Sequence, residues 1–148
     1  MDNEELTLFR DMAHRALEAE ISPYIEQWEA QHSVPRELWH TLRQAGLLCP
    51  DMPEEYGGAG TTAEVPFAVI EEMSRLSFGG IASGYSIHSN IVAPYIEHFG
   101  TEEQKSQWLP KMVTGEALGA LAMTEPSAGS DVQSIRTKAV KDGDEWIL

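Results

Sequence analysis

The chain has 148 residues, of which 42% are apolar and 23% charged, and its formal net charge is −14. This composition is typical of a soluble globular protein, and an acidic chain without a basic cluster is not expected to bind nucleic acid. The longest run of apolar residues and glycine, 117–123, is far shorter than the ~20 residues that cross a bilayer, so no membrane insertion is expected.

The acidic N-terminus and the single cysteine exclude several further classes. The start Met1-Asp2-Asn3-Glu4-Glu5 is unlike a signal or transit peptide. One cysteine, Cys49, excludes an intrachain disulfide framework. These features are compatible with a cytoplasmic location.

The first two predicted helices are interrupted or ended by proline and glycine. Apolar residues at helical spacing predict a first helix over 4–31, and Pro23 should kink it or split it in two. A second helix is predicted from about residue 33, with Pro35 in its first turn and Gly46 as its C-terminal stop.

A third helix follows an irregular stretch. Residues 49–60 contain two prolines and three glycines and are expected to form no regular structure. Thr61 and Glu64 have the spacing of a capping box, which predicts a helix that continues to a break at Gly79 and Gly80.

Two more helices are predicted before residue 115. Residues 81–99 are apolar or small on nearly every side, which is typical of a helix buried between others. Thr101 and Gln104 have capping-box spacing and predict the start of a fifth helix. The fold class is therefore mainly α, with about five helices.

After Gly115 the pattern changes to short strands. The predicted elements are a buried strand over Leu118–Thr124, a loop over Glu125–Asp131, a strand over Ser134–Val140, a hairpin turn at Asp142-Gly143-Asp144 and a third strand over Trp146–Leu148.

Most residues that could carry chemistry have a structural interpretation. The histidines have no HExxH spacing and no Cys/His cluster, so no metal site is predicted. His88 lies on the buried fourth helix and is interpreted as a hydrogen-bonded core residue. Cys49 has no evident base beside it and is interpreted as a packed side chain.

The segment Ala122–Asp131 (AMTEPSAGSD) is different, because a predicted strand runs into a loop with three hydroxyl side chains. Strand backbone can hydrogen-bond the edge of a flat heterocycle, and the Ser/Gly end can turn N–H groups toward a phosphate. A capped loop between two strands explains the same residues, and residue chemistry alone leaves both interpretations open.

This segment resembles the flavin-binding signature of the acyl-CoA dehydrogenases. Other stretches are similar to that family in the same order along the chain, namely Val34–Trp39 with Ala45–Leu48, Pro53–Gly60, Phe99–Lys105 and Leu109–Met112. Tyr85–Ser89 together with Ala122–Glu125 most resembles the long-chain branch of the family.

The resemblance implies a helical N-terminal domain over residues 1–116 and the opening strands of an incomplete middle β-barrel domain over 117–148. It implies FAD as cofactor and an acyl-CoA substrate. The residues implied to bind FAD are Leu121, Met123, Thr124, Gly129 and Ser130. The residues implied to bind acyl-CoA are Ser130, Val132, Ser83, Gly84 and Ile87. Small residues at Ser83 and Gly84 would leave room for a long or branched acyl tail, or would instead allow close helix packing.

The implied reaction is α,β-dehydrogenation of fatty acyl-CoA thioesters in β-oxidation, with electron-transfer flavoprotein as partner and a homotetramer as the full-length form. The family's catalytic glutamate belongs to a C-terminal domain, so no catalytic residue is expected here and Glu125 is not the base. On this interpretation the chain is a truncated portion and inactive alone. The alternatives are a catalytically silent helical scaffold and an oxygen-using relative such as an acyl-CoA oxidase.

Overall fold

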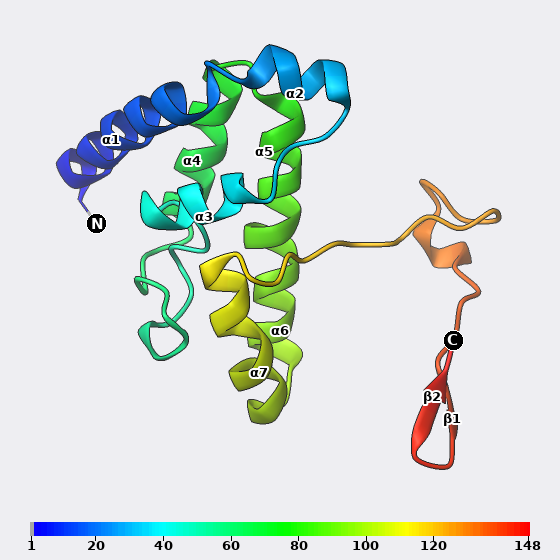
Figure 1. Ribbon diagram of the computed structural model, residues 1–148. Coiled ribbons are helices and arrows are strands. Elements are labelled where there is room, and N and C mark those ends of the chain that lie inside the picture. Colours follow the sequence, from blue (N-terminus) through cyan, green and yellow to red (C-terminus); the bar gives the residue numbers. More distant parts are fainter. Residues whose placement is uncertain (1) are drawn as a thin grey trace.

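The computed structural model describes residues 2–148 and is mainly helical, as predicted (Figure 1). The helices are α1 (Asn3–Ile21), α2 (Ile25–Gln31), α3 (Glu37–Gln44), α4 (Glu64–Arg75), α5 (Gly79–Tyr85), the π-helix η2 (Ser86–Val92), α6 (Ala93–Phe99) and α7 (Glu102–Thr114). The other elements are the 3₁₀ turns η1 (Glu54–Tyr56) and η3 (Val132–Ser134) and the strands β1 (Val140–Asp142) and β2 (Glu145–Ile147).

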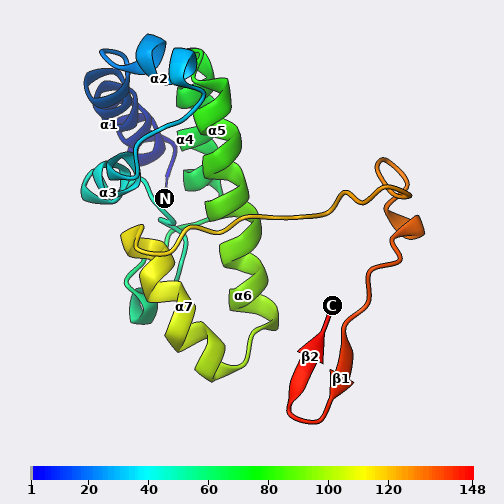
Figure 2. The same ribbon diagram turned by 45° about the vertical axis from the view of Figure 1, so that its right-hand side comes forward.

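The helices pack around one long central helix formed by α5, η2 and α6 (Figures 1 and 2). The first part of this helix contacts α4, and its last part contacts α7. α1 packs on the outer side of α4, and α3 contacts α7. The buried core lies among these helices and the loop after α3, and its largest apolar side chains are Leu17, Ile21, Leu47, Leu48, Met73, Tyr85 and Leu109.

Local sequence signals placed several helix ends correctly. The first predicted helix is split around Pro23 into α1 and α2. Gly46 follows α3 in the left-handed region, with φ +71°. At the start of α7, the Thr101 hydroxyl accepts from the Gln104 N–H at 3.2 Å, and the Gln104 side chain accepts from the Thr101 N–H at 2.9 Å. Each of these signals acts within a few residues.

Three other predicted boundaries were wrong. Pro35 precedes the N-cap residue Arg36 and lies outside the first turn of α3. The predicted Thr61–Glu64 capping box does not form: the N-cap residue of α4 is Ala63, which makes no side-chain cap bond, and the Thr61 N–H donates to the Pro50 carbonyl of the preceding loop. The break after α4 falls at Ser77, with φ +63°, and the two predicted helix-breaking glycines begin α5.

The long central helix differs from its prediction in two ways. Its middle part is a π-helix, which a period-3.6 pattern does not reveal. Its C-terminal end is also less buried than an all-apolar helix predicts, since Tyr95 is 62% exposed and Phe99 is 80% exposed.

The predicted hairpin turn and the third predicted strand are confirmed, the latter as β2, whereas the first two predicted strands are wrong over nearly all of their length. β1 and β2 pair antiparallel around Gly143, with Asp142 opposite Glu145. Leu118–Thr124 forms no strand and is not buried, and Ser134–Val140 contributes only Val140 to a strand. Within residues 2–148 no segment pairs with Leu118–Thr124, and in Ser134–Val140 only Val140 is paired, with Ile147. An alternating sequence without a partner strand does not make a ladder. Figure 2 shows residues 120–148, in orange to red, extending away from the helices.

The packing of α1 on α4 contains a buried ion cluster around Glu72. This side chain is 2% exposed, and its carboxylate lies 3.3 Å from Arg10 Nη1, 3.1 Å from His14 Nδ1 and 3.3 Å from Arg75 Nη1. Buried carboxylates are stable only when such partners compensate the lost hydration. Glu72 therefore ties α1 to α4.

We expect Glu72→Gln to lower the free energy of unfolding by about 1–3 kcal/mol, because the cations of the cluster lose their shared charge partner. Glu71→Gln is the matched control. Glu71 also pairs with Arg10 but is 57% exposed, so its loss should cost less than about 1 kcal/mol. Urea unfolding followed by circular dichroism measures the free energy of unfolding of both variants. Equal losses would show that Glu72 is not the main link between α1 and α4.

Candidate functional site

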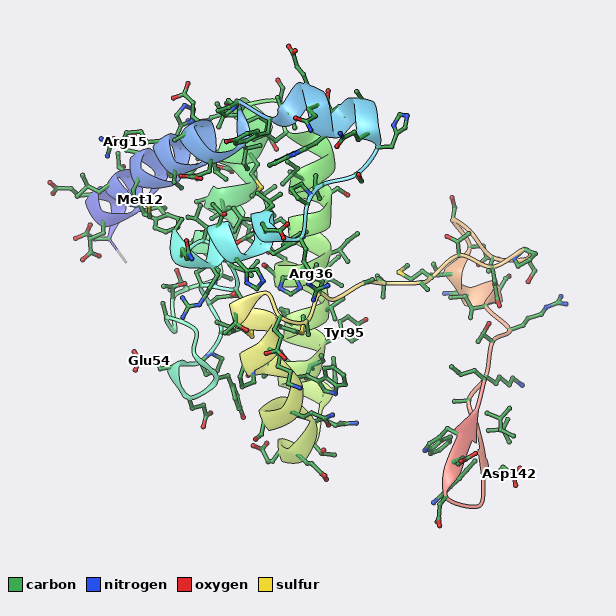
Figure 3. All side chains as sticks on the ribbon, viewed as in Figure 1. Met12, Arg15, Arg36, Glu54, Tyr95 and Asp142 are labelled. Carbon is green, nitrogen blue, oxygen red and sulfur yellow. The ribbon has the colours of Figure 1, made fainter. Side chains whose placement is uncertain are left out.

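The segment that leaves α7 is held by side chains of α3. Gly115 has φ +76°, and a Cβ there would lie 3.2 Å from the Trp39 backbone and side chain. His40 Nδ1 lies 3.1 Å from the Thr114 carbonyl, and Arg36 donates to the Glu116 carbonyl. Figure 3 shows Arg36 beside the start of this outgoing segment. Contacts with Arg36, Trp39 and His40 therefore hold residues 114–116, where the chain leaves α7.

His88 provides a second attachment from the central helix. Its side chain is 1% exposed, its Nε2 lies 3.1 Å from the Met112 carbonyl, and its Nδ1 lies 3.0 Å from the Gly119 amide nitrogen. Because a carbonyl only accepts and an amide N–H only donates, the ring is neutral with its proton on Nε2. Burial lowers the pKa of His88 and keeps this form. The predicted hydrogen-bonded core histidine is confirmed.

Besides its hydrogen bond to His88, Gly119 is closely packed. A Cβ on Gly119 would lie 2.8 Å from two atoms of the Val92 side chain and 3.0 Å from Met112 Cε. No larger residue fits without displacing these side chains. The backbone at residue 119 is therefore pressed against η2 and α7.

A hollow of about 320 Å³ opens where these elements meet. It is lined by Trp39, Gly84, Ile87, His88 and the segment 118–121. The hollow thus brings Gly84 and Ile87, which were predicted to bind acyl-CoA, together with Leu121, which was predicted to bind FAD. Ser83 is exposed and does not line it.

Beyond Gly119 the backbone is free. Within residues 2–148, no N–H or carbonyl of residues 120–124 takes part in a hydrogen bond. Leu121 is 45% exposed and Met123 is 49% exposed, and the Thr124 hydroxyl is exposed as well. An extended backbone with free donors and acceptors beside a hollow can receive the polar edge of a flat ring system.

The loop that follows is closed on itself. Glu125 and Ala128 exchange backbone hydrogen bonds of 3.1 and 3.0 Å. The Glu125 carboxylate accepts from the Thr137 hydroxyl at 2.6 Å, from the Thr137 N–H at 3.2 Å and from the Arg136 N–H. These bonds, the Thr137 hydroxyl first, lower the pKa of Glu125. A carboxylate held in its charged form by three donors is poorly suited to take up a proton.

The remaining predicted ligand residues lie farther along this loop. Gly129 and Ser130 are exposed, and Val132 is 46% exposed at the start of η3. None of them lines the hollow, and Figure 2 shows their part of the chain (orange) apart from the helices. The structure therefore does not bring them to Gly84 and Ile87.

Other kinds of site find no support in the described chain. Across residues 2–148 no cluster of three or more His, Cys, Asp or Glu side chains is placed to hold a metal ion. No helix in that range combines the length and apolarity needed to cross a membrane. Cys49 is fully buried, and desolvation raises its pKa to about 12, so it is not a ready nucleophile.

Sequence reasoning missed the groups that hold the site. The partner of His88 at Gly119 is 31 residues away. Arg36 and Trp39 were named only within the family-like stretch Val34–Trp39, and His40 received no role. Their spacing on α3, at i, i+3 and i+4, does place them on one helical face. That spacing was the available signal, but it does not reveal which segment the face would contact.

Comparisons with known proteins agree on one family. The family model "Acyl-CoA dehydrogenase, N-terminal domain" matches residues 3–116. The chain is 42% identical to the rat (Rattus norvegicus) "Long-chain specific acyl-CoA dehydrogenase, mitochondrial" over 144 residues, which is 97% of this chain and 33% of the relative. The chain thus spans about a third of the length of the curated relatives it matches.

Solved structures give the same result. A crystal structure of an acyl-CoA dehydrogenase from Geobacillus kaustophilus superposes with a TM-score of 0.92 at 44% identity, covering 99% of this chain and 38% of that one. A glutaryl-CoA dehydrogenase from Mycobacterium smegmatis in complex with FADH2 gives 0.90 at 30% identity, covering 100% of this chain and 38% of that one.

The lowered pKa of His88 predicts how acid affects stability. Since the unfolded state takes up the proton first, the contribution of neutral His88 is complete above about pH 6.5. It is lost as the pH falls through the pKa of the folded state, at most about 1.4 kcal/mol per pH unit. The free energy of unfolding of the native chain should therefore fall more steeply between pH 7.5 and 5 than that of His88→Asn. Parallel pH curves would show that His88 is not held neutral.

Proposed function

The chain belongs to the acyl-CoA dehydrogenase family, and from this membership we propose that it forms the N-terminal part of an FAD-dependent acyl-CoA dehydrogenase. In this proposal residues 1–116 are the helical domain and residues 117–148 open the middle β-barrel domain. The reaction is α,β-dehydrogenation of a fatty acyl-CoA thioester, as in β-oxidation.

The observation that carries the proposal is the free backbone of residues 120–124 beside the hollow. The FAD isoalloxazine ring needs donors and acceptors along one edge and an apolar surface against its face. The backbone at Leu121 and Met123, their side chains and the Thr124 hydroxyl supply both kinds of group. The residues present therefore fit the cofactor.

The other end of the cofactor would meet the loop. Gly129 and Ser130 leave N–H and hydroxyl groups exposed, and such groups suit the pyrophosphate of FAD. Ser130 and Val132 would also lie near the CoA part of the substrate. When bound, FAD supplies the acceptor for the hydride that leaves the substrate β-carbon.

The acyl tail is assigned to the hollow between α3 and the central helix. Gly84 and Ile87 form part of its wall, whereas the preceding residue, Ser83, is exposed and does not line it. An added Cβ at Gly84 would lie 3.6 Å from the Trp39 ring, at van der Waals contact, so the absence of a side chain lets Trp39 lie close to the helix. The hollow itself, of about 320 Å³, is our reason for proposing a long or branched fatty acyl group.

No residue of this chain is proposed as the catalytic base. Glu125 is the acid nearest the proposed flavin segment in sequence, but three hydrogen bonds hold its carboxylate. The base is assigned to a C-terminal domain, so residues 1–148 alone should be inactive. Electron-transfer flavoprotein as partner, a homotetrameric full-length form and a cytoplasmic location belong to the same proposal.

Anaerobic titration of the purified full-length protein with a fatty acyl-CoA tests the function. We expect a yellow protein whose flavin absorption is bleached by the substrate. Thr124→Val should weaken FAD retention by about tenfold through the loss of one hydrogen bond. Ser127→Ala, which removes an exposed hydroxyl from the same loop, is the control and should retain FAD normally.

Two results would replace this function by another. A colourless protein that FAD cannot reconstitute would indicate a scaffold without redox chemistry. Reoxidation by oxygen with release of peroxide during turnover would indicate an acyl-CoA oxidase.

Gly84→Trp in the full-length enzyme tests the assignment of the acyl tail. The new ring would fill the space beside Trp39, so kcat/KM for long substrates should fall at least tenfold relative to short ones. Gly79→Trp is the control, since Gly79 lies on the same helix with open space around it. An unchanged preference between long and short substrates would show that the acyl tail does not occupy this hollow.

A further inference from the structure

The two ring nitrogens of His88 bind two different parts of the molecule. Nε2 donates to the Met112 carbonyl within α7, and this bond joins two helices of the core. Nδ1 accepts from the Gly119 N–H, and this bond reaches outside the helices to the outgoing segment. A side chain that only filled the core would need the first bond and not the second.

The bond to Gly119 is the last one before the free backbone. The preceding tie is the Ala117 N–H, which donates to the Lys111 carbonyl at 3.0 Å. After Gly119, within residues 2–148, the next backbone hydrogen bond is made by Glu125. The place where residues 120–124 leave the helices is therefore set at Gly119.

His88 also lies at the hollow itself. Its ring is tilted against that of Trp39, with 5.7 Å between the centroids, and both rings line the hollow with Gly84 and Leu121. The same imidazole thus contacts both Gly119 of the outgoing segment and the Trp39 ring of the hollow. It sits on η2, a π-helical stretch of a kind that often occurs at functional sites.

We propose that His88 is a positioning residue: by accepting from the Gly119 N–H, it fixes residues 120–124 relative to the hollow lined by Gly84 and Ile87. The role in flavin binding rests on the proposed function, because FAD is the ligand assigned to that backbone. His88 acts on residues 120–124 through Gly119, and its ring also forms part of the wall of the hollow to which the acyl tail is assigned.

Two amide variants separate the two bonds. In His88→Asn the side-chain oxygen takes the place of Nδ1 and can still accept from Gly119. In His88→Gln the longer amide reaches the place of Nε2 and can still donate to Met112, but the acceptor for Gly119 is lost. Both variants replace the ring by an amide, so they are matched for loss of packing.

Amide hydrogen exchange in the 148-residue chain is the first readout. We expect His88→Gln to speed exchange at Gly119 by about tenfold relative to His88→Asn, with no faster exchange in α7, because His88→Gln keeps the bond to Met112. Equal exchange at Gly119 in the two variants would overturn the proposal. So would faster exchange that extends equally through α7, because it would indicate a structural role only.

The native chain offers a second readout that needs no variant to fold. A scalar coupling across the hydrogen bond should join the Gly119 amide nitrogen to His88 Nδ1, and the ¹⁵N shifts should place the proton on Nε2. Absence of the coupling, or a proton on Nδ1, would overturn the proposal.

Flavin affinity in the full-length protein separates this proposal from the proposed function. If FAD binds, His88→Gln should weaken its Kd by about tenfold relative to His88→Asn, and equal affinities would overturn the role in flavin binding. If the native protein binds no FAD while Gly119 still depends on His88, the proposed function fails and the positioning of residues 120–124 stands.

Discussion

The arrangement of the site depends on one buried, neutral imidazole that is hydrogen-bonded on both sides. His88 can serve the Met112 carbonyl and the Gly119 N–H together only in the tautomer with its proton on Nε2. A buried ring with either nitrogen unpaired would be costly. Core packing and the direction of the outgoing segment are therefore coupled through a single side chain.

The helices around this ring provide the rigidity that such a bond requires. α3 holds the end of α7 through Trp39, Arg36 and His40, while α1 and α4 are joined by the Glu72 cluster. The exposed backbone of residues 120–124 then projects from a fixed base. This contrast, a firmly held base with an unsatisfied segment beyond it, is what a protein needs to present backbone groups to a flat cofactor.

Sequence could predict the features that are decided within a few residues. Gly46 ends α3 as expected, because its left-handed backbone conformation is a local property. The Thr101–Gln104 capping box begins α7 as expected, because its hydrogen bonds join residues three apart. The expected buried strand over Leu118–Thr124 did not form, because a strand needs a partner and an apolar run in one segment does not supply it. The contact between His88 and Gly119 spans 31 residues and left no local signal.

In the structure Gly119 is anchored, while the backbone of residues 121–124 is free to bind a ligand. Amide hydrogen exchange of the full-length protein with and without FAD distinguishes these two parts. We expect Gly119 to be protected in both states, and the amides from Leu121 to Thr124 to exchange freely without FAD and become protected with it. Unchanged exchange across residues 121–124 on adding FAD, or an unprotected Gly119 in either state, would show that this assignment is wrong.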